Sequence, residues 1–554
     1  MVGNQAPVVI VGAGPVGMVL ALELAHHEID SVLVEAHAET TKFPKMDETN
    51  PRSMELLARL GLTDDLRAAG VPPEFSFDTV FCSSLEGFEY ARWSEPSVAQ
   101  MCERIDRATD GTLPGQPWQR ISQEYAEDVL MRRCLQNPRV DVLRPWRVTD
   151  VAEHDDEVTV TAVHAETGEA RTLSAGYVVG CDGARSRVRT CLGIEQDGME
   201  RILTLALVHF RSRDRERLQA HGQFWHLYFA SGGILIAQDE EETWTLHGLV
   251  PPDTELGNID PVEFIHRVCG APVEVDEILA QSIWQPNVLL ADHYRKGRIF
   301  LAGDACHQVI PNGGYGMNTG IGDAVDLGWK FAAVLHGWGG DALLDSYEAE
   351  RRPVAERNRD WSFRHVGAQL EIQSEVDLEL IGADTEEGGR HRHEMAAFIA
   401  ERRGEACSPG VEYGYRYEGS PAVVSEAGEG PALDPMRYEP TTRPGARAPH
   451  VVLPDGRSIL SLYSRGFTLV DHGGIGGEKF AAAAWAAGIP FEHVVIEASA
   501  GSASVYERAL VLVRPDGHVA WRGESVDDDP AAILATVTGH VIVPAAVPQE
   551  EATR

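Results

Sequence analysis

The sequence predicts an α/β protein in which a parallel-sheet domain is interwoven with a β-sheet domain and followed by a separate α/β domain. Three observations support this prediction. Residues 8–35 alternate strand, glycine-rich turn, helix and strand, and such a β-α-β unit implies a parallel sheet. Strand-rich segments then interrupt this pattern twice, and a new alternation of strands and helices begins near Gly445.

The first elements follow from hydrophobic spacing. Residues 8–11 are an apolar, β-rich run, residues 18–27 have helical spacing, and residues 31–34 form a second strand. After a polar, proline-containing stretch, residues 52–62 are expected to form another helix.

The turn between the first strand and the first helix is typical of dinucleotide binding. Its sequence, GAGPVG, contains Gly12, Gly14, Pro15 and Gly17. The first glycine permits a tight turn, the second lets the backbone approach a pyrophosphate, and the third permits close helix–strand packing. Glu35, at the end of the second strand, stands where a carboxylate accepts bonds from ribose hydroxyls. This turn by itself leaves FAD and NAD as alternatives.

Two strand-rich segments break up the first domain. Short alternating runs such as residues 79–82 occur in the first segment, and the aromatic runs QFWHLYF and ETWTLHG occur in the second. Between and after them the sequence returns to helices and buried strands. We therefore expect one discontinuous nucleotide-binding domain at 1–71, 118–195 and 285–370, and a β-sheet domain at 72–117 and 196–284.

The remaining chain divides at about residue 440. Residues 371–440 are helical at first, then rich in Gly, Pro and Glu, and are expected to form a connector. Residues 441–554 have strands and helices of their own. This C-terminal segment has no CxxC pair, so we expect it to pack or to dimerise rather than to exchange disulfides.

Composition excludes several classes of partner. The 554 residues include 48 Lys and Arg against 85 Asp and Glu, a formal charge of −37. No basic surplus exists to displace counterions from nucleic acid, and an acidic membrane surface would repel the chain. The N-terminus lacks the basic region of a signal peptide, and its apolar run is too short to span a membrane. The eight cysteines are scattered singly without metal-ligand spacing, so we expect a cytoplasmic protein with reduced thiols and no metal site.

A second glycine-rich segment decides between the two nucleotides. Residues 297–331 read GRIFLAGDACHQVIPNGGYGMNTGIGDAVDLGWKF, a strand followed by a Gly-Asp pair and by a turn that opens a helix. This run resembles the signature of the group A FAD-dependent aromatic hydroxylases, which is GDAxH, then a Pro, then GxGxN. The resemblance implies that Asp304 binds the ribityl chain of FAD and that Pro311 lies along the flavin edge.

The same resemblance assigns the start of the following helix. The backbone around Gly316, Met317 and Asn318 would face flavin N1 and the O2 carbonyl. A helix N-terminus at that position stabilises the anionic reduced flavin that hydride transfer generates.

Further matches lie between the two glycine-rich turns. CDGARSRVR resembles the DG motif of the family, in which Asp182 and Gly183 serve both FAD and pyridine nucleotide. Arg120 and Gln123 in QRISQ resemble residues that contact the pyrophosphate and ribityl groups, and Arg52 in NPRSMELLARLGL resembles an Arg near the flavin. The alternative for the last three residues is ordinary surface charge.

The C-terminal segment indicates which branch of the family the sequence resembles. GARAPHVVLPDGRSILSLYSRGFTLV resembles the phenol-hydroxylase branch, in which a thioredoxin-like domain follows the catalytic body. The resemblance therefore implies a glutathione-reductase-type, Rossmann-like FAD domain, an interwoven substrate domain and a thioredoxin-like C-terminal domain. It also implies that NAD(P)H binds without a second Rossmann domain.

The family's chemistry implies the function. NAD(P)H would reduce FAD, O2 would form a flavin C4a-hydroperoxide, and its terminal oxygen would hydroxylate a phenolic or hydroxy-heteroaromatic substrate. His226 and Tyr228, on one face of the QFWHLYF strand, are candidates for contacting that substrate, and the alternative is that they are core or interface aromatics. Two other functions stay open, namely Baeyer–Villiger oxygenation of an aromatic polyketide and sequestration of an aromatic ligand without turnover. A homodimer is compatible with all of them.

Overall fold

The computed structural model describes residues 5–497, 500–525 and 529–540, and its N-terminal unit begins with strand, turn and helix. Strand β1 (Gln5–Val11) is apolar and buried, and helix α1 (Pro15–His26) starts at a proline, which suits the first turn of a helix. Strand β2 (Ser31–Val34) runs parallel to β1. The predicted β-α-β unit is therefore present.

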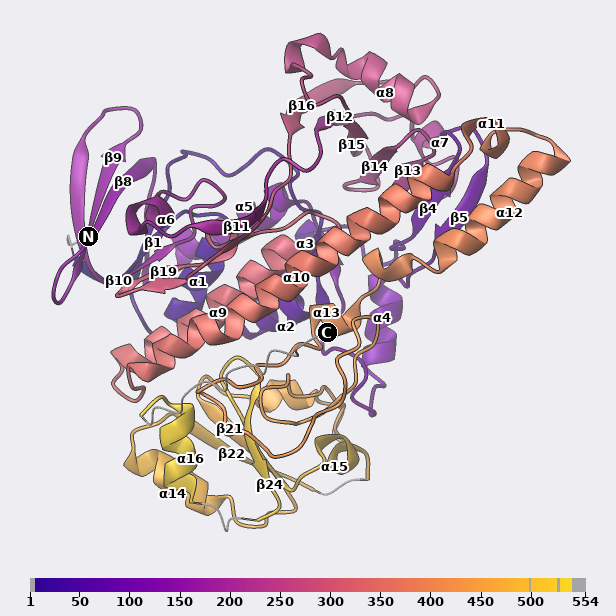
Figure 1. Ribbon diagram of the computed structural model, residues 1–554. Helices are drawn as coiled ribbons and strands as arrows, with labels where there is room; N and C mark the ends of the chain where they lie inside the picture. The colour runs from indigo at the N-terminus through magenta and orange to yellow at the C-terminus, as the bar shows by residue number, and fades with distance from the viewer. Residues whose placement is uncertain (1–4, 498–499, 526–528, 541–554) are drawn as a thin grey trace, which may run out of the picture.

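One mixed sheet is built around this unit (Figure 1). Its remaining strands are β7 (Val140–Leu143), β8 (Trp146–Glu153), β9 (Val158–His164), β10 (Ala170–Gly180), β18 (Arg295–Lys296) and β19 (Ile299–Leu301). Strands β19, β10, β1, β2 and β7 are parallel neighbours, while β8 and β9 extend β10 as an antiparallel hairpin. Helices α1, α5 (Gln123–Gln136) and α9 (Tyr315–Leu335) share its apolar core.

A second sheet lies away from the first, toward the other end of the N-terminal part of the molecule (Figure 1). Its order is β16-β12-β15-β14-β13-β4-β5. The strands are β4 (Thr79–Cys82), β5 (Glu89–Trp93), β12 (Leu205–Arg211), β13 (His226–Phe229), β14 (Gly233–Ala237), β15 (Thr243–Leu249) and β16 (Glu277–Trp284). Helix α8 (Pro261–Cys269) packs on one face of it. Segments more than a hundred residues apart thus share one sheet, because β4 pairs with β13.

Smaller elements join the two sheets. Strand β11 (Gln196–Met199) pairs with β17 (Val288–Ala291), which also pairs with β20 (His307–Gln308), so β11 does not belong to the second sheet. Strand β3 (Glu48–Thr49) pairs with β6 (Gln119–Arg120). These short pairings hold the chain where it crosses from one domain to the other.

A long helix connects the body with the segment that follows it. Helix α10 (Ala342–Glu375) lies beside α9 and runs diagonally across the molecule toward the second sheet (Figure 1). Helix α12 (Glu386–Ala400) then packs against β5. The predicted connector is therefore partly helical and contacts the second sheet.

The C-terminal domain has the strand order β22-β21-β23-β24. Its elements are β21 (Phe467–His472), α14 (Glu478–Ala486), β22 (Phe491–Ile496), α15 (Ala500–Tyr506), β23 (Leu510–Val513), β24 (Val519–Gly523) and α16 (Pro530–Val537). Strand β21 is parallel to β22 and antiparallel to β23, which is the thioredoxin-like topology. Trp329 of α9 packs edge-on against Phe467, so this domain shares a core with the body.

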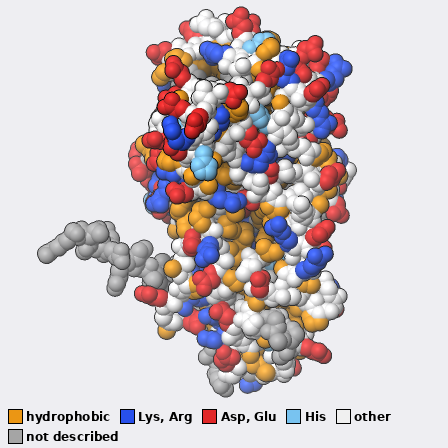
Figure 2. All heavy atoms as spheres, turned by 90° about the vertical axis from the view of Figure 1, so that its right-hand side faces the viewer, with side chains coloured by type: hydrophobic (Ala, Val, Ile, Leu, Met, Phe, Trp, Pro, Cys, Tyr) orange, Lys and Arg blue, Asp and Glu red, His pale blue; other side chains and the backbone are white. Residues whose placement is uncertain are grey.

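The surface carries charges of both signs. Figure 2 shows acidic and basic side chains mixed over one face, with hydrophobic side chains gathered across its middle. On that face no continuous basic stripe of the kind that binds nucleic acid is present. In the part of the chain that the structure describes, no helix is both long and apolar enough to cross a bilayer.

Candidate active site

The GAGPVG turn has the geometry that each of its glycines predicts. Gly12 has a φ of 101°, and a Cβ there would lie 2.4 Å from the carbonyl oxygen of Cys181. A Cβ on Gly17 would lie 2.0 Å from the carbonyl oxygen of Gly12. Around Gly14, by contrast, nothing lies within 4 Å of such a Cβ. Gly12 and Gly17 therefore permit close packing, and Gly14 faces open space that suits an approaching pyrophosphate.

Glu35 is bonded to this turn. One carboxylate oxygen accepts a hydrogen bond from the backbone N–H of Ala13 at 2.8 Å, and the other accepts one from the N–H of His37 at 2.8 Å. Each carboxylate oxygen has a second lone pair. Glu35 is thus held in place beside the turn and retains capacity to accept ribose hydroxyl groups.

Asp304 stands on the second predicted turn, where Gly303 has a φ of 64°. Its side chain has exposed surface. Enclosure by the surrounding protein nevertheless raises the pKa of the Asp304 carboxyl, and His307 and Lys45 oppose that rise. A carboxyl group that is accessible but surrounded by protein is compatible with binding a polar chain such as ribityl.

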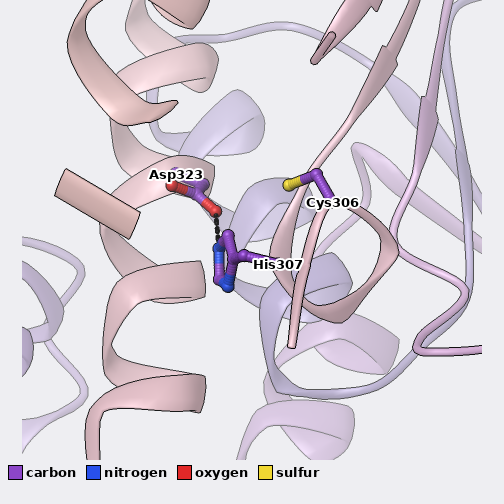
Figure 3. Close-up of side chains that lie close together, drawn as sticks. All are labelled: Cys306, His307 and Asp323. Carbon is purple, nitrogen blue, oxygen red and sulfur yellow. Dashed lines mark hydrogen bonds and ion pairs between the residues drawn. The ribbon is translucent and has the colours of Figure 1, made fainter. Parts of the chain in front are cut away.

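The turn is fixed from behind by Asp323 of α9. The Asp323 carboxylate accepts hydrogen bonds from the backbone N–H of Gly303 at 3.1 Å and from Nε2 of His307 at 2.7 Å (Figure 3). Although burial opposes it, His307 and Arg351 hold the pKa of Asp323 below its usual value. The His307 imidazole therefore helps to hold the turn in place through its bond to Asp323.

Cys306, His307 and Asp323 also have the composition of a metal site, since their ligand atoms lie within 4.8 Å of one another. The chemistry of the donors does not suit a cation. Burial raises the pKa of the Cys306 thiol well above its usual value, and this thiol donates to the carbonyl of Gly303. The Asp323 carboxylate already bonds to Arg351 at 2.8 Å. The three residues are better explained as packing behind the turn.

The start of α9 follows a glycine pair with positive φ, Gly313 and Gly314. Asn318 donates to the carbonyl of Gly314 at 2.6 Å and accepts from the backbone N–H of Asn50 at 3.0 Å. Gly316 and Met317 on the same turn are partly exposed. This helix start is therefore positioned by its neighbours and keeps accessible backbone, as a site for the flavin ring requires.

The residues of the DG motif have different surroundings. Asp182 accepts from the hydroxyl of Ser186 at 2.5 Å and from the backbone N–H of Arg187 at 2.6 Å, which caps a short helix. Gly183 has a φ of 76°, and nothing lies within 4 Å of a Cβ built on it. The glycine thus faces open space while the aspartate supports the loop.

The arginines and the glutamine that were expected to contact FAD bond to other parts of the protein. The buried Arg120 of β6 bonds Glu240 at 2.6 Å and the carbonyl of Ala237 at 2.7 Å, at the end of β14 in the second sheet. Gln123 donates to Glu127 at 2.6 Å within α5. Arg52 donates to the carbonyl of Asp516 at 2.7 Å, so it faces the C-terminal domain.

The second sheet has one apolar face and one mixed face. Leu227 and Phe229 of β13 are buried in the core under α8. The intervening residues point to the opposite face. In the antiparallel register, His226 is paired with Ile236 and Tyr228 with Ile234. We call the residues of this face the β13–β15 wall, and they are His226, Tyr228, Ile234, Ile236 and His247. All but Tyr228 are partly exposed.

Asp47 holds the first residue of the wall. Its carboxylate bonds Nε2 of His226 at 3.2 Å and accepts from Nε1 of Trp225 at 2.9 Å. Burial by itself raises the pKa of the Asp47 carboxyl, but these two bonds outweigh burial and leave the pKa below its usual value. Asp47 is therefore ionised and orients the imidazole.

Glu405 holds the second residue of the wall. Its carboxylate accepts from the hydroxyl of Tyr228 at 3.1 Å, from Asn312 at 2.8 Å and from Gln369 at 2.6 Å. Burial and the Glu405 charge raise the pKa of Tyr228 well above its usual value, so the phenol keeps its proton. Pro311, the residue expected at the flavin edge, directly precedes Asn312 and is exposed.

Two further acids lie nearby and were not predicted. A Cβ on Gly314 would lie 2.9 Å from a Glu48 carboxylate oxygen, so this acid faces the start of α9. Burial and repulsion from Glu412 raise the pKa of Glu48 well above its usual value, and burial raises the pKa of Glu412 to about 7. Asp47, Glu48, Glu405 and Glu412 escaped prediction because they belong to no recognised motif. The only signal was the polar stretch before the helix at 52–62.

Comparison with known proteins identifies the family. A family described as "FAD binding domain" matches residues 5–362, and one described as "Aromatic-ring hydroxylase, C-terminal" matches residues 441–542. The chain belongs to the FAD-dependent aromatic-ring hydroxylases. The predicted family, fold class, FAD and NAD(P)H dependence and monooxygenase activity are thereby confirmed.

Individual relatives match over almost their whole length. The FAD-dependent monooxygenase apdD of Emericella nidulans is 41% identical over 97% of this chain and 90% of its own. The 4-methyl-5-nitrocatechol 5-monooxygenase of Burkholderia is 32% identical, over 97% of this hydroxylase and 98% of the relative. The structure of the rebeccamycin biosynthetic enzyme RebC with reduced flavin is 33% identical, with a TM-score of 0.86 over 97% of this chain and 99% of RebC.

Proposed function

We propose that this hydroxylase uses NAD(P)H and O2 to hydroxylate a phenolic or hydroxy-heteroaromatic compound that binds against the β13–β15 wall. One observation supports this more than any other: two adjacent acids join the wall to the predicted flavin turn. Asp47 bonds His226 of the wall, and Glu48 lies against Gly314 at the start of α9. The ring to be hydroxylated and the predicted flavin edge would therefore be neighbours, as oxygen transfer requires.

Bound FAD would supply the transfer of electrons from NAD(P)H and the activation of O2. The open space at Gly14 and the enclosed but accessible Asp304 fit its pyrophosphate and ribityl groups. The residues proposed to hold the cofactor are Gly12, Gly14, Pro15, Gly17, Glu35, Asp182, Gly183, Asp304, Pro311, Gly316, Met317 and Asn318. The bonds of Arg52, Arg120 and Gln123 to other protein groups support structural roles for these three residues instead.

Asp47 and His226 would control the proton of the substrate hydroxyl. Because the ionised Asp47 accepts a hydrogen bond from Nε2 of His226, this ring nitrogen carries a proton. The other ring nitrogen, Nδ1, has no hydrogen bond to any described residue and, when it carries no proton, can accept the proton of the substrate hydroxyl. Removal of the substrate proton makes the aromatic ring more electron-rich, which speeds attack on an electrophilic oxygen.

The rest of the wall would hold the ring and exclude water. Ile234 and Ile236 offer an apolar surface beside His226, and Tyr228 stacks on Phe81 with ring centroids 5.0 Å apart and an interplanar angle of 12°. Water exclusion matters because activated oxygen that is exposed to water would be released as hydrogen peroxide without hydroxylating the substrate. The phenolic ring in the name of the Burkholderia relative supports the same class of substrate.

The direct test is NAD(P)H oxidation and O2 uptake across phenols, catechols and hydroxypyridines, with product mass and ring-position analysis. We expect substrate-stimulated uptake and one oxygen added to the ring. A product with oxygen inserted beside a ketone, or tight binding without stimulated uptake, would contradict the proposal.

Two variants test the proton step. His226→Gln should lower kcat by about a hundredfold, because positioned general bases contribute about 10²–10⁴. His266→Gln is the matched control, since His266 lies on α8 and bonds the carbonyl of Val273 away from the wall. Equal kcat in both variants would remove His226 from the proton step.

A further inference from the structure

We propose that a hairpin of the C-terminal domain positions the FAD-binding turn of the catalytic body through a chain of buried side chains. The hairpin joins β23 to β24 and reads Arg514-Pro515-Asp516-Gly517-His518. The inference rests on the assignment of the Gly303–Asp304 turn to FAD, as proposed above. It gives this domain, which lacks the cysteine pair of a redox thioredoxin, a role in the flavin site.

Arg351 of α10 is the residue that links the two regions. Its Nε donates to Asp323 at 2.8 Å, the same carboxylate that holds the N–H of Gly303 and the imidazole of His307. A second guanidinium nitrogen donates to the carbonyl of Thr319, in the early part of α9, at 2.9 Å. Arg351 thus braces both parts of the predicted FAD site, the ribityl turn and the helix start that follows it.

The sequence makes room for this guanidinium. Gly322 lies beside it, and a Cβ at that position would lie 2.6 Å from a terminal nitrogen of Arg351. Arg351 is 1% exposed. A buried guanidinium with an unpaired N–H group destabilises the folded state. The third hydrogen-bond partner of Arg351 therefore helps to determine the position of its side chain.

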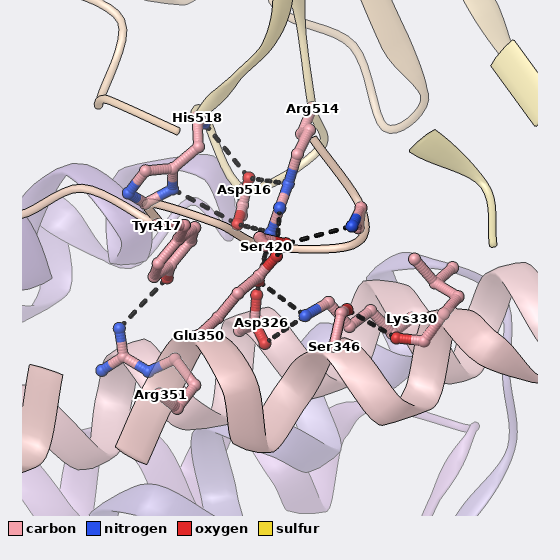
Figure 4. A network of polar contacts seen from close by, with 12 residues as sticks. Asp326, Lys330, Ser346, Glu350, Arg351, Tyr417, Ser420, Arg514, Asp516 and His518 are labelled. Carbon is pink, nitrogen blue, oxygen red and sulfur yellow. Dashed lines mark hydrogen bonds and ion pairs between the residues drawn. The ribbon is translucent and has the colours of Figure 1, made fainter. Parts of the chain in front are cut away.

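That third partner comes from outside the FAD domain. The remaining guanidinium nitrogen donates to the hydroxyl of Tyr417 at 3.1 Å, and Figure 4 shows this hydroxyl directed at Arg351. The Tyr417 ring packs against the imidazole of His518, with the ring centroids 4.1 Å apart and the planes tilted by 32°, and it lies under the guanidinium of Arg514 at 5.1 Å. Tyr417 is therefore held between the C-terminal hairpin and Arg351.

The hairpin is in turn locked to helices α9 and α10. Arg514 bonds Asp516 at 2.7 Å within the hairpin, Glu350 of α10 at 2.7 Å and Asp326 of α9 at 3.0 Å (Figure 4). Lys330 bonds the same two helix acids, each at 2.7 Å. Every one of these side chains is buried, so the hairpin has little freedom to move relative to the two helices.

The chain of contacts leads to a specific expectation. Without the Tyr417 hydroxyl, Arg351 loses one of its three partners and its hold on Asp323 loosens. The turn that carries Asp304 would then bind FAD less tightly. The ring of Tyr417, and with it the packing of the hairpin, would remain.

The test compares Tyr417→Phe with Tyr506→Phe in the full-length holoenzyme. Tyr506 is also fully buried in the C-terminal domain and donates to the carbonyl of Pro449 at 3.0 Å, but it has no contact with this network. FAD release on dilution, followed by flavin fluorescence, gives the dissociation constant, and reductive titration gives the flavin midpoint potential. Thermal unfolding of both variants measures the structural effect of losing a buried hydroxyl.

We expect Tyr417→Phe to raise the FAD dissociation constant about tenfold, which is about 1.4 kcal/mol, and to shift the midpoint potential. Tyr506→Phe should leave both values unchanged, even if the two variants lose similar thermal stability. Equal FAD affinity and potential in the two variants would overturn the inference. Asp304→Ala separates this failure from a failure of the FAD assignment: if Asp304→Ala also retains FAD, the assignment of the turn is wrong as well.

Discussion

The hydroxyl of Tyr228 donates a hydrogen bond to the carboxylate of Glu405 at 3.1 Å, across 177 residues of sequence. The same carboxylate accepts from Asn312, the residue after Pro311. A residue from the segment between α12 and the C-terminal domain thus connects the β13–β15 wall to the turn expected at the flavin edge.

Replacement of this carboxylate should weaken substrate binding. In Glu405→Gln the amide retains one acceptor oxygen and presents an NH2 group to donors that previously met a carboxylate. The loss of a hydrogen bond in this partly buried site costs about 1 kcal/mol, so we expect KM to rise about fivefold in a folded, FAD-loaded protein. Steady-state kinetics measure KM and kcat. Glu401→Gln, on the exposed end of α12, is the control and should leave KM unchanged.

The FAD assignment predicts a loss of cofactor. Because Asp304 is the enclosed but accessible carboxyl of the second turn, Asp304→Ala should purify largely as apoprotein while the unmodified chain purifies yellow. Flavin absorbance per chain measures the content. Asp155→Ala, on an exposed hairpin, should retain one FAD per chain. Full and tightly held FAD in Asp304→Ala would count against the role of this residue.

Glu412 predicts how stability depends on pH. Burial raises its pKa to about 7 from an ordinary value of 4.5, so the folded state binds this proton more tightly than the unfolded state does. Stability from this group is therefore present at low pH and decreases as pH rises from about 4.5 through 7. Glu412→Gln removes this pH dependence. The free energy of unfolding of the variant, minus that of the unmodified protein, should be about 1–3 kcal/mol larger at pH 8 than at pH 5.

Thermal unfolding of both proteins at the two pH values measures this difference. The exposed Glu418 provides the control variant, Glu418→Gln, which should change the melting temperature equally at pH 5 and pH 8. A Glu412→Gln protein whose advantage is the same at both values would show that this carboxyl is not protonated in the folded state at pH 5 to 7.

Substitution of Arg120 tests whether the main role of this residue is structural. Arg120 bonds Glu240 at 2.6 Å, and both side chains are buried. Arg120→Met leaves Glu240 as an uncompensated buried charge and should lower the free energy of unfolding by about 3–5 kcal/mol. Adding Glu240→Gln should recover part of that loss. Chemical denaturation measures both free energies of unfolding. If the Arg120→Met protein is as stable as the unmodified protein but has lost FAD, the result would support a direct contact between Arg120 and the cofactor.

The sequence determined the features that depend on a few neighbouring residues. The roles of Gly12, Gly14 and Gly17 follow from a strand, a turn and a helix in direct succession, because backbone sterics within one turn decide where a Cβ fits. The alternation of His226 and Tyr228 against Leu227 follows from the two-residue period of a strand. The thioredoxin-like order of the C-terminal domain likewise agrees with its resemblance to the phenol-hydroxylase branch.

Tertiary structure alone decided which distant side chains meet. Asp47 reaches His226 across 179 residues, Arg52 reaches Asp516 across 464, and Arg514 reaches Glu350 across 164. Such pairs leave no periodic trace, because a charged residue in a loop looks the same in sequence whether it faces water or a buried partner. Their positions depend on how two sheets and a third domain pack, and that packing is set by apolar surfaces elsewhere in the chain. The bond from Asp47 to the β13–β15 wall, and the contacts from the C-terminal hairpin to the Gly303–Asp304 turn, are therefore properties of the assembled fold.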